Sequence, residues 1–576
     1  MRGTPKHIRF VLLHTKGGDL SFMKLFEYAE SHPQEILAVT DDGERIPYAQ
    51  MNTLAKKLRE LVGHRLVFVL CRNTPGSLLG YLGLLQSGGV SLLLDADIAP
   101  KLLQDLAERY RPAFCLMPED LPEGCRIALR EAWHRAFNAQ AHRPGNAVSD
   151  PTLATFPDTV FSTDPGAFPL KEVLAVRDYR LVVFAPAGQD PPLAPELRLL
   201  LATSGSTGSS KLVRISAQNL DANAASIVEY LQITKNERPI TVLPMQYSYG
   251  MSIINTHVMA GAPILLTNHT LMETDFWNRA RKDKATSLCG VPYTFSMYSR
   301  LGLLQMDLPD LRTITQAGGK LPEEHHLQFA RWCSKKGIRF CVMYGQTEAS
   351  PRMGWLPPEK AIEKCGSMGI AIPGGRLDLL DENGNILPAA PGDLPEEDGS
   401  VGPATRSRDL RGETAETDTG TRFLGPVGEL VYTGPNVALG YAESAPDLIK
   451  GDEFCGVLHT GDMARRDADG YFYIVGRRSR FIKIVGKRIS LDEVEKLLRS
   501  SFPELDFACT GKDDDLQIWL ALPDRTAETE FAELTERISG FVSDMTGIPG
   551  KSMTVTLLQK IPRSSSGKIL YAALPQ

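Results

Sequence analysis

The sequence lacks the long apolar segments that membrane and secreted proteins carry. None of its 576 residues belongs to an apolar stretch near the roughly 20 residues that a membrane span needs. The one short apolar run at the N-terminus, residues 10–13, is too short for the apolar part of a secretion signal. These absences predict a cytoplasmic protein without an integral membrane segment.

The sequence also lacks a basic excess and any pair of closely spaced cysteines. The net charge is −6, and no long stretch carries the positive charge that a nucleic-acid backbone attracts, so a nucleic-acid partner is not expected. Nine cysteines are scattered without a CxxC pair, which argues against a zinc site or a disulfide framework. We expect reduced and mostly buried thiols.

The pattern of the chain predicts more than one α/β domain. A chain of this length is too long for a single core. Helical spacing at residues 48–62 and 78–86 alternates with short apolar runs at 66–71 and 90–94, which is typical of βαβ units and a mostly parallel sheet. Further strands are predicted at residues 181–184, 199–202, 240–243, 263–266, 340–343 and 471–475.

The last third of the chain changes character twice. Residues 391–422 are polar and charged, cannot bury much apolar surface, and are predicted to be a disordered insertion, with a functional loop as the alternative. The last hundred residues read as a small α+β domain, with a helix at 490–498 that opens with a capping box, Ser490 with Glu493. The segment 323–326 is interpreted as a solvated helix face, and 467–470 as a hairpin turn.

The strongest chemical signal is TSGSTGSSK at residues 203–211. Gly205 and Gly208 allow the backbone to turn tightly, while hydroxyl and N–H groups supply donors for phosphate oxygens. The spacing differs from the GxxxxGK[ST] loop of another nucleotide-binding class. A flexible linker is the alternative; the preceding apolar run and the terminal Lys211 favour a phosphate-binding loop.

This loop resembles that of the adenylate-forming (AMP-binding) superfamily of acyl-CoA synthetases, peptide-synthetase adenylation domains and luciferases. Similar motifs follow in the family's order along most of the chain. They are LQSGG at 85–89, QAGGK at 316–320, YGQTE at 344–348, GELVYTG at 428–434 with GY at 440–441, TGD at 460–462, GR at 476–477, GKR at 486–488 and PRSSSGK at 562–568.

The resemblance implies a fold and a two-step reaction. It implies a large N-terminal AMP-binding domain, residues 1–476, with mixed and parallel sheets flanked by helices, and a mobile α+β C-terminal domain, residues 477–576, joined by a hinge. The implied enzyme is an acid–thiol ligase that uses ATP and Mg²⁺ to convert a small carboxylic acid to acyl-AMP with release of pyrophosphate. It then transfers the acyl group to CoA or to the phosphopantetheine of a carrier protein acting in trans.

The resemblance also assigns roles at the reacting end. Lys568 is expected to bridge the acyl carboxylate and the phosphate, because adenylation brings two anions together and needs positive charge at the reacting centre. Thr347 is expected to contact the α-phosphate. Glu348 follows a predicted strand and suits Mg²⁺, which prefers oxygen ligands.

The remaining nucleotide contacts are implied residue by residue. Tyr344 is expected to lie against adenine, Asp462 to accept both ribose hydroxyls, and Arg477 to donate to the same ribose. The other predicted nucleotide-binding residues are Thr203, Ser204, Gly205, Ser206, Thr207, Gly208, Lys211, Gly318, Gly319, Lys320 and Gly345.

The predicted acyl pocket begins at Tyr247. Amino-acid-activating members usually place an Asp next to this aromatic position, but Ser248 stands here, so an α-amino acid is disfavoured because its ammonium would be buried without a counter-charge. Val291, Gln316 and Ala317 are expected to line the rest. This set fits a fatty, short or aryl acid and does not choose among them.

Two alternatives to a CoA ligase stay open at this point. One is a ligase that acylates only a carrier protein, and the other is a nucleotide-binding protein that has lost catalysis. The chain also departs from the family's pattern: Ser479 stands at the pivot position, Ser210 and Leu212 flank Lys211, and Tyr571 replaces a frequently basic residue.

Overall fold

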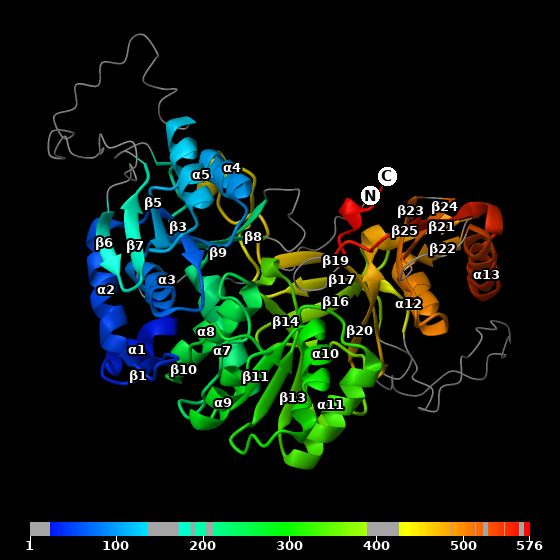
Figure 1. Cartoon of the computed structure of the whole chain (residues 1–576), viewed down its shortest axis with the longest axis horizontal. Helices are drawn as coiled ribbons and strands as arrows, with labels where there is room; N and C mark the ends of the chain where they lie inside the picture. Colours follow the sequence, from blue (N-terminus) through cyan, green and yellow to red (C-terminus); the bar gives the residue numbers. More distant parts are fainter. Residues whose placement is uncertain are drawn as a thin grey trace, which may run out of the picture.

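The computed structural model describes residues 23–135, 172–185, 190–202, 211–388, 425–484, 487–512, 514–521, 528–546, 548–563 and 569–575. The chain runs from a blue and turquoise part through a green central part to an orange and red part at the opposite end of the molecule (Figure 1). Strands and helices alternate along most of it, so the predicted α/β class is confirmed. The predicted insertion at 391–422 lies outside the described residues.

The first part of the chain forms an eight-stranded sheet together with one strand from later in the chain, β18. The strand order is β18-β9-β8-β4-β3-β5-β7-β6. The pairs joining β8, β4, β3 and β5 are parallel. Their apolar runs follow from burial on both faces. The strands are β3 Leu66–Cys71, β4 Val90–Asp95, β5 Phe114–Pro118, β6 Glu172–Val176, β7 Tyr179–Val183, β8 Leu197–Ala202, β9 Leu212–Ser216 and β18 Gly440–Ala442.

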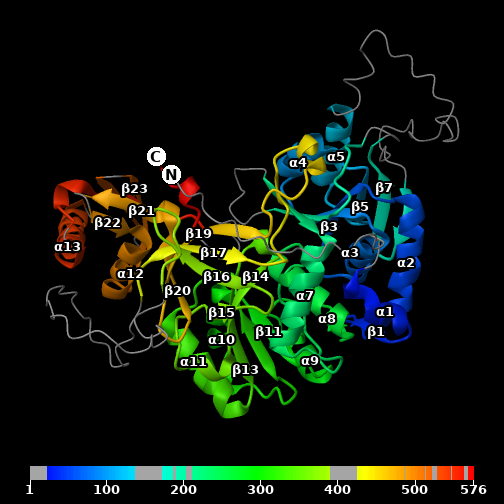
Figure 2. The same cartoon turned by 180° about the vertical axis from the view of Figure 1, so that it is seen from behind.

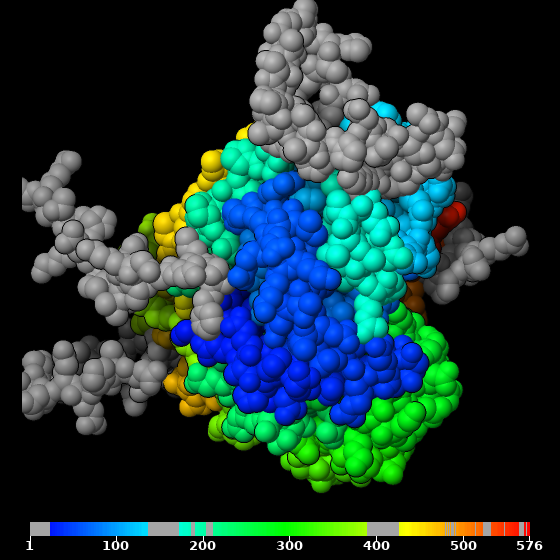
Figure 3. Space-filling view, turned by 90° about the vertical axis from the view of Figure 1, so that its left-hand side faces the viewer, coloured from blue at the N-terminus to red at the C-terminus, as the bar shows by residue number. Residues whose placement is uncertain are grey.

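Helices cover both faces of this sheet. α3 (Pro75–Ser87) packs on the face that carries Val67 and Val69, and α4 (Pro100–Tyr110) with α5 (Glu123–Trp133) packs on the opposite face. α2 (Tyr48–Leu61) packs against α3. On the side shown in Figure 3, the blue N-terminal part adjoins the turquoise part of the chain. Arg177, in the turn between β6 and β7, forms an ion pair with Glu44 at 2.8 Å.

The central part contains a second sheet, in the order β11-β12-β13-β14-β15. β11, β12 and β13 are parallel, and β14 and β15 join antiparallel. The bounds are β11 Ser287–Gly290, β12 Thr313–Gln316, β13 Arg339–Gly345, β14 Arg352–Leu356, β15 Ile370–Ala371, α9 Thr274–Lys282, α10 Pro292–Arg300 and α11 Glu323–Lys336.

Two helices join the eight-stranded and five-stranded sheets into one body. α7 (Ala217–Leu231) begins where Ser216 and Asn219 cap its first turn through reciprocal hydrogen bonds of 2.9 and 3.1 Å. α7 and α8 (Ser248–Ala260) lie between the two sheets in both Figure 1 and Figure 2. Their apolar residues belong to the cores on both sides, because each helix is apolar on more than one face.

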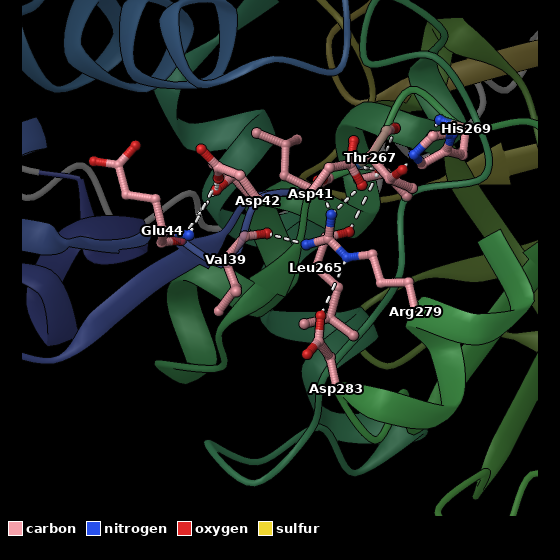
Figure 4. Close-up of polar contacts among 12 residues, drawn as sticks. Val39, Asp41, Asp42, Glu44, Leu265, Thr267, His269, Arg279 and Asp283 are labelled. Atoms are coloured by element: carbon pink, nitrogen blue, oxygen red, sulfur yellow. Dashed lines mark hydrogen bonds and ion pairs between the residues drawn. The ribbon is translucent and has the colours of Figure 1, made fainter. Parts of the chain in front are cut away.

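A buried arginine ties α9 to a small third sheet. Arg279 is 5 % exposed, donates to the carbonyl oxygens of Val39 (2.5 Å) and Leu266 (3.0 Å), and forms ion pairs with Asp41 and Asp283 (Figure 4). A buried charge needs such partners, so this network is structural. The small sheet is β1 Ile36–Val39, β2 Arg45–Pro47 and β10 Ile264–Leu265.

A four-stranded antiparallel sheet leads into the last part of the chain. Its strands are β16 Arg376–Leu380, β17 Gly428–Thr433, β19 Val457–Arg466 and β20 Phe472–Arg477. At the β19–β20 turn, Asp467 Oδ1 accepts from the backbone of Asp469 (3.1 Å) and Tyr471 (2.9 Å), and Gly470 adopts φ +85°. The hairpin turn predicted at 467–470 is confirmed.

The C-terminal part has a hydrophobic core of its own, made by residues such as Leu498, Ile518 and Val542. β20 continues through the predicted boundary, because Arg477 pairs with Asp462 in the β19–β20 ladder. The division at 476/477 therefore stays a prediction. The elements are β21 Phe481–Ile484, β22 Lys487–Ser490, α12 Leu491–Ser501, β23 Asp506–Lys512, β24 Asp515–Ala521, α13 Glu528–Thr546 and β25 Met553–Leu558.

Short helices complete the chain's regular structure. They are α1 Glu27–Ser31 and the 3₁₀ turns η1 Lys24–Phe26, η4 Leu303–Gln305, η5 Thr347–Ala349, η6 Pro358–Lys360, η7 Ala445–Ile449, η8 Arg478–Arg480, η9 Gly550–Ser552 and η10 Tyr571–Ala573. Every helix in the described ranges is too short or too polar to cross a membrane.

Most predicted elements match the structure, and two predictions are wrong. The segment 323–326 is not a wholly solvated helix face, because His326 is buried and forms a hydrogen bond with the carbonyl oxygen of Ala361 at 2.8 Å. The strand predicted at 240–243 is absent; Pro239 and Ile240 form only isolated bridges, because proline has no N–H for a regular ladder. The expectation of reduced and mostly buried thiols is confirmed, because all nine cysteines are free and all except the exposed Cys455 are buried. The side chains of the capping box predicted at Ser490 lie outside the described residues.

Candidate active site

A cleft of about 620 Å³ opens where the five-stranded sheet meets strands β19 and β20. β12 and β13 end at this cleft and α8 begins at its wall, so it lies beyond the carboxyl ends of parallel strands, where α/β folds bind ligands. It is lined by residues 247–249, 316–321, 342–348, 351–352 and 366–368, with His326, Asp462, Ile474, Gly476, Arg477 and Asp492.

The cleft gathers most of the described residues that the sequence predicts for the site. These are Tyr247, Ser248, Gln316, Ala317, Gly318, Gly319, Lys320, Tyr344, Gly345, Thr347, Glu348, Asp462 and Arg477. Val291 is buried behind Gly318. The loop residues Thr203, Ser204, Gly205, Ser206, Thr207 and Gly208, and the catalytic candidate Lys568, lie outside the described residues.

Asp462 is the most firmly held carboxylate of the cleft. It is 5 % exposed, and its Oδ2 accepts hydrogen bonds from the Tyr344 hydroxyl and from Gln346 Nε2 at 2.9 Å. Its Oδ1 pairs with Arg477 Nε at 2.7 Å. The hydrogen bond between Tyr344 and Asp462 thereby holds two segments, more than a hundred positions apart in the sequence, on one wall of the cleft. Sequence reasoning missed Gln346, although it stands at the variable position of the YGxTE motif.

Burial shifts the pKa values of Asp462 and of the neighbouring Tyr344. Burial raises the pKa of Asp462 and outweighs the opposing effect of the Arg477 guanidinium. Burial and the neighbouring Asp462 charge raise the pKa of Tyr344 well above its usual value, so the phenol stays a donor. The predicted roles, Tyr344 against adenine and Asp462 on the ribose, remain predictions.

Glu348 presents a second carboxylate to the same cleft. Tyr441 donates its hydroxyl to Glu348 Oε1 at 2.8 Å, and the Lys211 ammonium lies 4.3 Å from the centre of the Tyr441 ring. The Thr347 hydroxyl contacts the Ser248 hydroxyl at 3.4 Å. A single carboxylate beside a place for phosphates fits Mg²⁺, which takes few protein ligands and completes its shell with phosphate and water. No cluster of three metal-ligating side chains occurs among the described residues.

Two glycines that line the cleft stand where a side chain would collide with neighbouring residues. Gly318 adopts φ +84°, and a Cβ there would lie 2.6 Å from the Tyr247 hydroxyl and 3.0 Å from Val291. A Cβ on Gly345 would lie 1.7 Å from the Pro351 carbonyl oxygen. Gly318 therefore allows the close contact with Tyr247 and Val291, and Gly345 allows its backbone to approach that of Pro351.

The C-terminal part reaches the cleft through Asp492 of α12. Its Oδ2 accepts from the backbone N–H of Arg477 at 3.2 Å, and its Oδ1 pairs with Arg480 at 2.6 Å. Lys320 Nζ donates to the carbonyl oxygen of Ile474 at 3.3 Å and so joins the adjacent wall. Asp492 carries no motif signal of its own, which explains why sequence reasoning missed it.

The described residues on either side of 564–568 contact other parts of the C-terminal region. Arg563 and Ile569 form an antiparallel bridge, and Arg563 pairs with Asp506 at 2.6 Å. On the other side, the Tyr571 hydroxyl donates to Glu495 at 3.0 Å and its ring stacks on Arg480 at 3.8 Å. Tyr571, a departure from the family's pattern, thus has a structural contact in place of a basic side chain.

Comparison with known proteins assigns this cleft to a family. The sequence profile described as AMP-binding enzyme matches residues 25–442. Indoleacetate–CoA ligase of Aromatoleum aromaticum is 25 % identical over 75 % of this chain and 76 % of its own length. 2-Succinylbenzoate–CoA ligase of Bacillus licheniformis is 26 % identical over 64 % of this chain and 68 % of its own length.

Solved structures have the same fold. The O-succinylbenzoate coenzyme A synthetase of Bacillus subtilis in complex with AMP superposes with a TM-score of 0.66 at 20 % identity, covering 96 % of this chain and 98 % of that chain. The ATP-bound MatB of Rhodopseudomonas palustris gives a TM-score of 0.63 at 20 % identity and similar coverage. The predicted enzyme class, an AMP-dependent acid–thiol ligase, is confirmed, and the chain belongs to the family of AMP-binding enzymes.

Proposed function

We propose that this enzyme activates a small carboxylic acid with ATP and passes the acyl group to CoA. In the first step a carboxylate oxygen attacks the α-phosphorus and pyrophosphate leaves. In the second step a thiol attacks the acyl carbon, a thioester forms and AMP leaves. The observation that carries the proposal is the meeting of residues 344–348 with Asp462 and Arg477 around one cleft.

The nucleotide end of the cleft is assigned to the wall built on Asp462. Its carboxylate is already oriented by Tyr344, Gln346 and Arg477, so ribose binding would require little further ordering of the protein. Gly318, Gly319 and Lys320 line the same cleft and are proposed to contact the nucleotide. The hydroxyl and N–H groups of residues 203–208, with Lys211, are proposed to bind the phosphates.

The reacting end is assigned to Thr347, Glu348 and Lys568. Mg²⁺, when bound, neutralises phosphate charge in this reaction. Glu348 is proposed as its protein ligand, and the Tyr441 hydroxyl holds that carboxylate in place. Thr347 is proposed to donate to the α-phosphate. Lys568 is proposed to bring positive charge to the reacting carboxylate and phosphate, which is the largest electrostatic need of the step.

CoA is the acceptor that the comparisons favour. The similar curated proteins are named as CoA ligases, and none of those named here is described as acting on a carrier protein. The C-terminal unit from residue 477, turning about Ser479, is proposed to exchange Lys568 for the face around Gly486 and Arg488 between the two steps. We place the reaction in the cytoplasm, where ATP and CoA are both supplied.

The test is pyrophosphate release from ATP and Mg²⁺ with a panel of acids, with and without CoA. The proposal expects turnover that needs one acid and CoA together, and loss of that turnover in Lys568→Ala. Acid-dependent adenylate formation that CoA fails to accelerate would move the acceptor to a carrier protein. Full activity in Lys568→Ala, or no response to any acid, would contradict the proposal and favour a protein that only binds nucleotide.

A further inference from the structure

A buried arginine stands at the inner end of the cleft, away from the nucleotide wall. Arg352 opens β14 and is 3 % exposed. It lines the cleft, and together with Tyr249 and Met343 it also lines a second cavity deeper in the fold. The side chain therefore lies where the tail of an acid would end, once its carboxylate sits near Thr347.

Among the residues that the structure describes, the guanidinium of Arg352 has no anionic partner. It lies 4.1 Å from the centre of the Tyr249 ring, and one terminal nitrogen contacts the Ser252 hydroxyl at 3.4 Å. Its Nε is buried without a hydrogen-bond partner, and no carboxylate of the described ranges forms an ion pair with it. A buried charge is costly unless hydrogen bonds or a counter-ion compensate it.

The side chains that contact Arg352 are neutral, and the carboxylate that lines the deeper cavity, Glu237, lies 4.0 Å from Arg312. Burial raises the pKa of Tyr249 well above its usual value and also raises the pKa of Tyr230. Burial raises the pKa of Cys289 to about 12, although the guanidinium acts in the opposite direction. None of these groups supplies negative charge near neutral pH, so among the described residues Arg352 has no compensating charge in contact with it.

The carboxylates that line the cleft are engaged elsewhere. Asp462 pairs with Arg477, and Asp492 pairs with Arg480. Glu348 accepts from the hydroxyl of Tyr441. These contacts hold the three carboxylates that line the described cleft at the nucleotide end, away from Arg352.

We propose that the acid activated here carries a second anionic group, and that Arg352 binds this group at the inner end of the cleft. The proposal rests on the proposed function, because it names the class of acid for the same reaction. A guanidinium binds a carboxylate through two parallel hydrogen bonds, so a dicarboxylic acid is the class that fits. An acid with a terminal ammonium group is excluded by like charge.

The experiment compares acids in matched pairs. Each pair consists of a straight-chain or aryl dicarboxylic acid and the monocarboxylic acid in which a methyl group replaces the far carboxylate. Pyrophosphate release gives kcat/KM for each acid with the wild type, with Arg352→Met and with Arg339→Met. Arg339 lines only the deeper cavity, where it donates to Leu231 and Thr313, and so controls for loss of a nearby cation.

The wild type should prefer the dicarboxylic member of at least one pair by about 100-fold or more, as expected when a site is built to bind a group that the analogue lacks. Arg352→Met should abolish or reverse that preference while keeping turnover of the monocarboxylic acid. Arg339→Met should keep the preference. Preference for the methyl-ended acid in every pair, or an unchanged ratio in Arg352→Met, would overturn the proposal.

A binding measurement separates this proposal from the proposed function. Acyl-sulfamoyl adenosines made from both acids of a pair mimic the acyl-adenylate and need no turnover, and calorimetry gives their affinities. Tighter binding of the carboxylate-ended compound to the wild type, lost in Arg352→Met, supports the proposal; equal affinities overturn it. Absence of pyrophosphate release with every acid would contradict the proposed function, and the binding ratio would still decide the role of Arg352.

Discussion

Replacing Asp462 with asparagine tests the nucleotide wall of the cleft most sharply. The carboxylate accepts from Tyr344 and Gln346 on one oxygen and pairs with Arg477 on the other. An asparagine amide keeps one acceptor and turns a donor toward groups that are themselves donors. We therefore expect both misorientation of the side chain and weaker binding of the ribose hydroxyls.

The size of the effect follows from the bonds that are lost. A hydrogen bond to a charged group contributes about 1.5–3 kcal/mol. Loss of one such bond to ATP gives about 1.5–3 kcal/mol, which corresponds to a fall in kcat/KM for ATP of about 10- to 150-fold. The assay is pyrophosphate release at varied ATP with the acid saturating.

Asp467→Asn is the matched control. Asp467 is 4 % exposed, lies next to β19 and accepts from Lys364 at 3.0 Å, but it is not part of the cleft. The same substitution there should lower the unfolding free energy by about 3 kcal/mol, because it breaks a buried ion pair, and should leave KM for ATP unchanged. An Asp462→Asn enzyme with the wild-type KM for ATP would refute the assignment of this wall.

Three further predictions concern other parts of the molecule. Gly318→Ala should raise KM for the acid about tenfold, because the added Cβ would displace the Tyr247 hydroxyl. Gly337→Ala is the control: Gly337 has φ +69° and open space around it, so this substitution should cost only about 1 kcal/mol of stability. Equal kinetics in the two variants would argue against crowding of Tyr247. Burial lowers the pKa of His257 to about 4, so between pH 6.5 and pH 4 the unfolded state binds the extra proton. Denaturant titrations should show stability falling by up to about 3 kcal/mol more in the wild type than in His257→Gln, and parallel curves would contradict this. Tyr571→Phe removes the hydrogen bond from the Tyr571 hydroxyl to Glu495, close in sequence to Lys568. Pyrophosphate release should slow about tenfold, while thioester formation from added acyl-adenylate should be unchanged. Equal loss of rate in both steps would exclude this explanation.

Local patterns in the sequence were enough to predict much of the fold. Apolar runs bounded by turn residues identified β3, β4, β8 and β13, because strands buried on both faces read as continuous apolar segments. The prediction at 240–243 failed because a run of similar composition, flanked by prolines, lies beside a sheet without joining its ladder. Which strands become neighbours, such as β18 beside β9, depends on contacts between distant residues that a single sequence does not show.

The site was predictable where short motifs carry the chemistry. YGQTE and TGD pointed to residues that the structure brings to one cleft. Arg352 was missed although it follows the YGQTE motif by only a few residues, because a charged residue at the start of a strand is usually solvated and only the fold shows that this one is buried without a counter-ion. Asp492 was missed for a related reason: it reaches the cleft from another part of the chain.

The most direct test of the central claim follows a carboxylate oxygen through the reaction. The acid is labelled with heavy oxygen in its carboxylate, turned over with ATP, Mg²⁺ and CoA, and the products are analysed by mass spectrometry. Formation of an acyl-adenylate predicts AMP that carries one labelled oxygen for each thioester formed, since the attacking oxygen stays on the α-phosphorus when the thiol displaces it. Unlabelled AMP, or ADP and phosphate in place of AMP and pyrophosphate, would contradict the account.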